Sequence, residues 1–213
     1  MIRETFPVGM LQCNCTVLAD ESSKEAIVVD PGADIPRILA VLAKHALTLK
    51  QIVITHAHFD HIAGAQELKR LTGAPISFNQ ADLRLALMLN EQPSWVGLKV
   101  APVEHLPQLD QDLRDGQRGG VDGLKGLVVL TPGHTQGSLC LWFPENDLLL
   151  AGDTLFAGSV GRTDLPGGDG RQLLHSIKDR LLGLPEQTLV VPGHGGSTSI
   201  GAERGDNPFL QNL

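Results

Sequence analysis

Short aliphatic runs alternate along the chain with stretches that have the periodicity of a helix. The runs 15–19 (CTVLA) and 25–30 (EAIVVD) flank the polar turn DESSK, and 51–55 (QIVIT) follows a helical stretch at 34–47 (DIPRILAVLAKHAL). Strands that alternate with helices in this way are typical of sheets covered by helices. The pattern therefore predicts a layered α/β fold.

Three helices are predicted in the first half of the chain. In the first of them, Asp34 is placed to cap the N-terminus and Pro36 lies in the opening turn. A second helix at 62–71 (IAGAQELKRL) is expected to end at Gly73, and 81–89 (ADLRLALML) is a third.

The second half returns to strands after a stretch rich in Pro, Gly and Asp, from about 92 to 123. Strands are predicted within GLVVLTPGH, SLCLWF and DLLLAGD, followed by a helix at 171–184 and a strand within QTLVVPGH. No segment is long enough or biased enough in composition to act as a linker between domains. Residues 1–213 are therefore predicted to form a single domain.

Four of the aliphatic runs end in a histidine or an aspartate. These runs are QIVITH, LVVLTPGH, LLLAGD and LVVPGH, and each is continuously apolar, as expected of a strand that is covered on both faces. Polar side chains that follow such strands lie at the ends of the sheets. The functional residues are therefore expected at strand ends.

The stretch THAHFDHIAG (55–64) holds three of the eight histidines and one aspartate. In an extended segment residues i and i+2 face the same way, so His56 and His58 can converge on one ion. Asp60 and His61 lie where the chain turns into the next helix and point to a neighbouring position. One stretch can thus supply two metal sites. With the other strand ends, the predicted metal ligands are His56, His58, Asp60, His61, His134, Asp153 and His194.

A set of five histidines and two aspartates suits a borderline divalent ion. Zinc is the first expectation, and iron or manganese is also compatible with these donors. A polar network in the core is the alternative, but many titratable groups at apolar strand ends would carry a heavy desolvation cost without a metal. The isolated His45, His105 and His175 are instead expected to satisfy hydrogen bonds in the core.

The composition of the chain argues against some classes of binding partner and indicates where in the cell the protein is expected. The formal charge of −7 and the lack of a Lys/Arg cluster argue against binding of nucleic acid. No run approaches the roughly 18 apolar residues of a membrane span, and the N-terminus has no apolar signal region. A cytoplasmic protein is expected, and the sequence leaves its oligomeric state open.

The three cysteines are expected to be reduced thiols, because an odd number in a chain without an export signal does not suggest a disulfide framework. Cys13 and Cys15 could bind metal as a Cys-x-Cys pair. On an alternating strand both would share one face, where cysteine packs as a small hydrophobe. We favour this packing role.

The segments THAHFDH, TPGHTQGS, LLLAGDTLF and VVPGHG resemble, in order and spacing, the metal-binding motifs of the metallo-β-lactamase superfamily. GDTLFAGSVGRTDLPGGD and the tail GHGGSTSIGAERGDNPFL are most similar to its glyoxalase II group, in particular the short bacterial members. The resemblance implies a four-layer αββα sandwich with two metal ions at one edge of the sheets. By carry-over, His56, His58 and His134 would hold the first ion and Asp60, His61 and His194 the second, with Asp153 bridging them.

The same resemblance implies a metal-dependent thioester hydrolase of the hydroxyacylglutathione hydrolase type. Such an enzyme cleaves S-D-lactoylglutathione to D-lactate and glutathione through a hydroxide that bridges the metals, with Asp60 and Asp153 as the catalytic carboxylates. Longer members add a C-terminal helical region and use tyrosines to hold glutathione. This chain ends soon after His194 and contains no Tyr, which weakens the assignment of the substrate.

Other functions remain open at this point. The alternative enzyme is a mononuclear-iron glutathione persulfide dioxygenase, a relative that uses two histidines and an aspartate at the positions of His56, His134 and Asp153. A β-lactamase and a metal-free binding module are less favoured, since no export signal is found and all seven ligands are present. Arg162 could contact an anionic substrate or pair with Asp164, and both readings stand.

Overall fold

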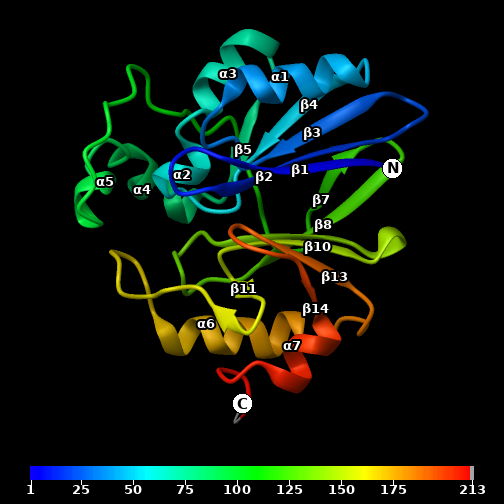
Figure 1. Cartoon of the computed structure of the whole chain (residues 1–213), viewed down its shortest axis with the longest axis vertical. Coiled ribbons are helices and arrows are strands. Elements are labelled where there is room, and N and C mark those ends of the chain that lie inside the picture. Colours follow the sequence, from blue (N-terminus) through cyan, green and yellow to red (C-terminus); the bar gives the residue numbers. More distant parts are fainter. Residues whose placement is uncertain (212–213) are drawn as a thin grey trace.

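The computed structural model describes residues 1–211 and contains two six-stranded sheets that pack face to face (Figure 1). The first sheet has the order β1-β2-β3-β4-β5-β6 and the second the order β14-β13-β10-β9-β8-β7. The strands of the first sheet are β1 Ile2–Val8, β2 Cys13–Ala19, β3 Glu25–Val29, β4 Thr48–Val53, β5 Ile76–Phe78 and β6 Gln111–Asp112. Those of the second are β7 Arg118–Val121, β8 Leu124–Leu130, β9 Leu139–Phe143, β10 Leu148–Gly152, β13 Leu189–Pro192 and β14 Thr198–Ser199.

Helices cover the outer face of each sheet. In Figure 1, α1 (Ile35–Lys44) and α3 (Ala65–Thr72) lie over the first sheet, and α6 (Gly170–Ser176) and α7 (Ile200–Asp206) lie below the second. The described residues also include three shorter α-helices and a small hairpin: α2 Phe59–Ile62, α4 Leu83–Leu87, α5 Gln92–Trp95, β11 Leu155–Phe156 and β12 Ser159–Val160. The order of layers is helix, sheet, sheet, helix, which confirms the predicted αββα sandwich.

The alternation along β2 shows how the layers are built. Cys13, Cys15 and Val17 are fully buried in the cluster between the first sheet and its helices. Leu18, the next residue after Val17, points the other way, into the cluster between the two sheets, where it joins residues such as Phe143 of the second sheet. Both cysteines therefore pack in the core, as predicted.

Strand direction explains where the functional residues meet. In the second sheet β10 runs parallel to β13 and antiparallel to β9, which is antiparallel to β8. The strands β8, β10 and β13 therefore point the same way, and their C-terminal ends share one edge. The segment that follows β4 in the first sheet approaches this edge, since the amide of Leu139 donates to the carbonyl of Thr55 at 2.9 Å.

Three local predictions need correction. Asp34 makes no side-chain cap to α1, because its carboxylate accepts a hydrogen bond from the amide of Gly9 at 2.9 Å. The helix predicted at 62–71 is two helices, α2 and α3, and only the second ends at Gly73. The helix predicted at 171–184 changes to a π-helical turn at Ile177–Leu181, where the amide of Leu182 donates to the carbonyl of Ile177.

Candidate metal centre

The first group of predicted ligands comes from both sheets. His56 and His58 follow β4, and His134 follows β8. The Nε2 atom of His134 lies 3.2 Å from Nε2 of His56 and 2.9 Å from Nδ1 of His58. All three side chains are buried. Nitrogen atoms of three rings therefore face one point.

The second group lies beside the first. His61 in α2 and His194 after β13 bring their Nε2 atoms to 3.2 Å, and Oδ2 of Asp60 lies 3.1 Å from Nε2 of His194. His61 is fully buried, whereas Asp60 and His194 are partly open to solvent. The second group thus offers two nitrogens and one oxygen.

Asp153, at the end of β10, joins the two groups. One oxygen, Oδ1, lies 3.5 Å from Nε2 of His61. The other, Oδ2, lies 3.6 Å from Nε2 of His134 and 3.7 Å from that of His194. The structure therefore brings all seven predicted ligands together, with Asp153 between them.

In three of the histidine rings, the oxygen that lies beside Nδ1 determines which ring nitrogen carries the proton. Nδ1 of His134 lies 2.7 Å from the carbonyl of Arg162, Nδ1 of His194 lies 3.0 Å from the carbonyl of Leu11, and Nδ1 of His61 lies 3.0 Å from Oδ2 of Asp30. An oxygen acceptor at that distance requires the proton to be on Nδ1. In the neutral form of each ring, Nε2 then presents a lone pair to the cluster.

Such a cluster is repulsive unless a cation lies within it. Lone pairs face each other at about hydrogen-bond distance, and Oδ1 of Asp153 is buried without a hydrogen-bond partner among the described residues. Burial holds the pKa of His56 well below its ordinary value, and burial together with the neighbouring His134 lowers that of His58 to about 3. These rings are therefore neutral ligands near pH 7. The donor set fits divalent ions that accept imidazole and carboxylate, among them zinc, iron and manganese.

Asp30 is a functional residue that the sequence analysis missed. It directly follows β3 and is almost fully buried. Its Oδ1 accepts the amide of Thr55 at 2.7 Å, and its Oδ2 accepts the Thr55 hydroxyl at 2.7 Å as well as Nδ1 of His61. The carboxylate thus orients one ligand and anchors the loop that carries two others. Its signal was present in the sequence, since the run EAIVVD also ends in an aspartate.

Two glycines are required by close approach. At Gly193 a Cβ atom would lie 2.1 Å from Oδ1 of Asp153, so any side chain would displace that carboxylate. At Gly152 the backbone has φ +49°, and a Cβ atom would lie 2.5 Å from the hydroxyl oxygen of Thr55. Gly152 thus provides a backbone conformation that favours glycine, and Gly193 makes room for a ligand.

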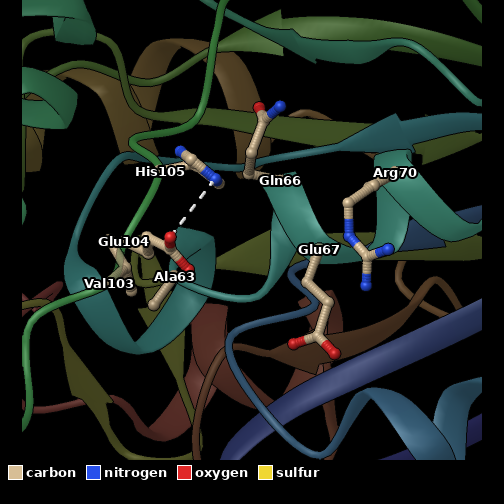
Figure 2. A pocket seen from close by; sticks show the side chains of 7 residues that line it. All are labelled: Ala63, Gln66, Glu67, Arg70, Val103, Glu104 and His105. Carbon is tan, nitrogen blue, oxygen red and sulfur yellow. Dashed lines mark ion pairs between the residues drawn. The ribbon is translucent and has the colours of Figure 1, made fainter.

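The three remaining histidines stay outside the centre, and none lies in the core, although one of them has a side-chain partner. His45 is half-buried and its Nε2 lies 2.8 Å from Oε1 of Glu4. His105 and His175 are exposed, so their assignment to the core was wrong. His105 borders a cavity of about 310 Å³ beside α3, where it forms a long ion pair of 3.9 Å with Glu104 (Figure 2). None of the seven predicted ligands lines this cavity.

A separate cavity of about 260 Å³ opens onto the cluster. Its floor includes His58, Asp60, His134, Asp153 and His194, and its apolar walls are Leu11, Phe59, Trp95, Val96 and Leu165. Arg162 also reaches this cavity, but its guanidinium forms a two-pronged ion pair with Asp164 at 2.7 and 2.8 Å. The structure therefore shows the ion pair that was one of the two readings of Arg162.

Comparison with known proteins identifies the family. Residues 8–194 match the family model described as the metallo-beta-lactamase superfamily. The chain belongs to this superfamily. It is 36% identical to hydroxyacylglutathione hydrolase GloC of Haemophilus influenzae, over 97% of this chain and 97% of that protein. Membership makes it a metal-binding hydrolase-fold protein, as the motifs predicted.

Solved structures of superfamily members share the fold. The BLEG-1 B3 metallo-beta-lactamase has a TM-score of 0.89 at 34% identity, covering 99% of this chain and 100% of that one. TTHA1623 in a di-iron-bound form has a TM-score of 0.84 at 35% identity, with coverage of 99% and 100%. ETHE1 of Myxococcus xanthus has a TM-score of 0.80 at 29% identity, with coverage of 98% and 84%.

Within residues 1–211, no helix is long and apolar enough to cross a membrane.

We expect the purified protein to hold close to two transition-metal ions per chain, because two donor groups share Asp153. Restoring metal to chelator-treated protein should raise its melting temperature, since a ligand at 100 times its dissociation constant adds about 2.7 kcal/mol to folding stability. Elemental analysis and thermal denaturation measure both quantities. One ion per chain under saturating zinc, iron or manganese would contradict this expectation.

Proposed function

We propose that the protein is a metal-dependent thioester hydrolase that cleaves S-D-lactoylglutathione to D-lactate and glutathione. The observation that carries this proposal is the pair of donor groups joined by Asp153. The similarity to a hydroxyacylglutathione hydrolase over nearly the whole length of both chains supports the choice of substrate.

We assign His56, His58 and His134 to one metal ion, and Asp60, His61 and His194 to a second, with Asp153 shared between them. Zinc is our first expectation for both positions. Two bound divalent ions would supply a nucleophile at neutral pH and stabilise negative charge on the thioester oxygen. No serine or cysteine nucleophile is then required, and the three cysteines are buried away from solvent.

The protein contributes carboxylates and fixed ring orientations. Asp60 and Asp153 are the two carboxylates that line the cavity, and we propose them as the catalytic carboxylates. Asp153 sets the spacing of the two groups, and Asp60 completes the second group beside His194. The carbonyls and the carboxylate behind His61, His134 and His194 fix the ring orientations before a substrate arrives.

The size and lining of the cavities favour weak binding of the glutathione part of the substrate. The cavity over the cluster, at about 260 Å³, lies below the roughly 300–1,000 Å³ of typical ligand pockets. A neighbouring cavity of about 410 Å³ shares Trp95 with it and is lined by apolar side chains such as Leu85 and Met88. The thiol arm can extend toward this second cavity. Because Arg162 is paired with Asp164, Arg84 in the second cavity is the arginine that remains at these two cavities for the two glutathione carboxylates.

A reducing, cytoplasmic location is consistent with this substrate and with the thiols. Cys13, Cys15 and Cys140 are buried and free, and burial raises the pKa of Cys140 to about 11. Such thiols stay protonated and serve as packing groups. The net charge of −7 supports a small-molecule partner over nucleic acid.

The second candidate is the mononuclear-iron persulfide dioxygenase. It is favoured by one observation: His134 adjoins the other two ligands of that pattern, with its Nε2 3.2 Å from His56 Nε2 and 3.6 Å from Asp153 Oδ2. The fold similarity to ETHE1 points the same way. The presence of a complete second group, Asp60, His61 and His194, favours the hydrolase.

Incubation of metal-loaded protein with S-D-lactoylglutathione should release a thiol that a chromogenic disulfide reports. We also expect S-D-lactoyl-N-acetylcysteamine, which lacks the glutathione carboxylates, to be cleaved with a kcat/KM within about tenfold of the glutathione thioester, because few contacts contribute remote binding energy. Nitrocefin hydrolysis and persulfide-dependent oxygen uptake serve as parallel assays. Absence of thiol release from any acyl-glutathione, with both metals verified, would refute the proposal.

A further inference from the structure

Asp82 is a buried carboxylate that belongs to neither ligand group. It ends the short helical turn Gln80–Asp82 that follows β5, and its relative exposure is 2%. Its carboxylate accepts three hydrogen bonds. Oδ2 accepts the amide of Ala57 at 2.9 Å and the hydroxyl of Thr135 at 2.8 Å, and Oδ1 accepts the amide of Gly137 at 2.7 Å.

The three donors lie on the two loops that carry the first ligand group. Ala57 is the residue between His56 and His58, in the loop that leaves the first sheet. Thr135 directly follows His134, and Gly137 lies in the same loop between β8 and β9 of the second sheet. The Asp82 side chain therefore connects the two loops, one from each sheet, that carry the histidines of the first ligand group.

The close approach at Gly137 shows that the loops are fitted to this carboxylate. A Cβ atom on Gly137 would lie 2.6 Å from Cγ and 2.8 Å from Cβ of Asp82, so no other residue fits without displacing Asp82. A buried carboxylate is costly unless it is well hydrogen-bonded, and here two backbone amides and a hydroxyl satisfy it. Because all three groups donate a hydrogen bond, both side-chain oxygens at this position must be acceptors.

We propose that Asp82 is a positioning residue that holds the His56–His58 loop against the His134 loop, so that the first group keeps the spacing needed to bind its metal ion. This inference rests on the proposed metal-dependent function. Asparagine has nearly the same shape but replaces one acceptor by an NH₂ group, which would face an N–H or O–H donor. The two loops should then separate, and only the first group should be affected.

The test measures metal binding directly, without substrate, in the His194→Ala background, where the second group is incomplete. Competition between the protein and a chromogenic zinc chelator gives the affinity of the first group. Asp82→Asn should weaken that affinity by about tenfold or more, the range seen when the partner of a metal ligand is removed. In the His58→Ala background, which leaves the second group complete, the same substitution should change zinc affinity by less than about twofold.

Asp112→Asn is the matched control. Asp112 accepts the amide of Gln80 at 2.9 Å in the same turn, but its partners do not include the ligand loops. It should leave both affinities unchanged, and circular dichroism checks the fold of every variant. If Asp82→Asn fails to fold, Thr135→Val removes one of the three bonds and should weaken the first group about threefold, in line with the loss of a single hydrogen bond.

Three results would overturn the inference. Equal losses in both backgrounds would show that Asp82 supports packing in general. No loss in either background, or an unchanged affinity in Thr135→Val, would show that the loops hold without it. Because zinc affinity is the readout, absence of thioesterase activity in the wild type would refute the proposed function without deciding this question.

Discussion

Replacing Asp153 with asparagine should reduce thioester hydrolysis by about 1,000-fold, the largest effect we expect from a single substitution. Asp153 is the side chain whose two oxygens face both ligand groups, with Oδ1 near His61 and Oδ2 near His134 and His194. Loss of its charge weakens both metal positions at once. A reduction of 1,000-fold corresponds to about 4 kcal/mol of transition-state stabilisation, which is in the range attributed to metal-ion catalysis.

The variant should remain folded, because its side chain keeps its shape and β10 is anchored by β9 and β13 on either side. Asp206→Asn, an exposed carboxamide exchange in α7, is the control and should retain full activity. Steady-state kinetics and elemental analysis of both proteins measure the effect. If Asp153→Asn kept two ions and more than about a tenth of the activity, the bridging role of Asp153 would be wrong.

The sequence was most informative where function depends on local geometry. The spacing of His56 and His58 follows from the two-residue repeat of an extended chain, and His134, Asp153 and His194 come shortly after the ends of β8, β10 and β13. Parallel strand ends meet at one edge of a sheet, so ligands far apart in sequence could be assigned to one site. The motif resemblance added the pairing of the two sheets.

Residues that act through distant partners were not predictable in the same way. Asp82 draws its three donors from positions 25 to 55 residues away, and nothing in its own helical surroundings marks it as a ligand support. Asp34 was predicted as a helix cap from its position before Pro36, yet its carboxylate accepts the amide of Gly9, in the turn between β1 and β2, instead. In both cases the partner is set by tertiary packing, and local patterns carry no record of it.

The exposed histidines illustrate the opposite error. His105 and His175 were predicted to lie in the core because isolated histidines commonly satisfy buried hydrogen bonds. Both side chains are exposed in the structure. Helical periodicity in 171–184 is imperfect, and the π-helical turn from Ile177 changes which side chains face the second sheet. His175 lies in α6 before that turn and His105 lies outside the helices, so the exposure of each depends on how its own segment packs, which a single histidine in the sequence does not indicate.

His194→Ala should separate the two candidate enzymes. In the dioxygenase pattern the metal is held at the positions of His56, His134 and Asp153, so His194 would lie outside the ligand set. In a two-metal hydrolase His194 is required, since its Nε2 is 3.2 Å from that of His61 and 3.1 Å from Oδ2 of Asp60. Its loss should lower occupancy of the second position and reduce turnover by about 100-fold or more.

The side chain of His194 is 28% exposed at the edge of the second sheet, so its removal creates no closed cavity and the fold should survive. His175→Ala, at an exposed position of α6, is the matched control and should behave as the wild type. Thioester hydrolysis, persulfide-dependent oxygen uptake and metal content are measured for all three proteins.

A His194 variant that lost one ion but kept near wild-type hydrolysis would exclude the two-metal mechanism, because the second group would then contribute nothing to catalysis. Oxygen uptake with persulfide by the wild type and the His194 variant alike, without thioester hydrolysis, would instead establish the dioxygenase, since the ligands at His56, His134 and Asp153 are intact in both.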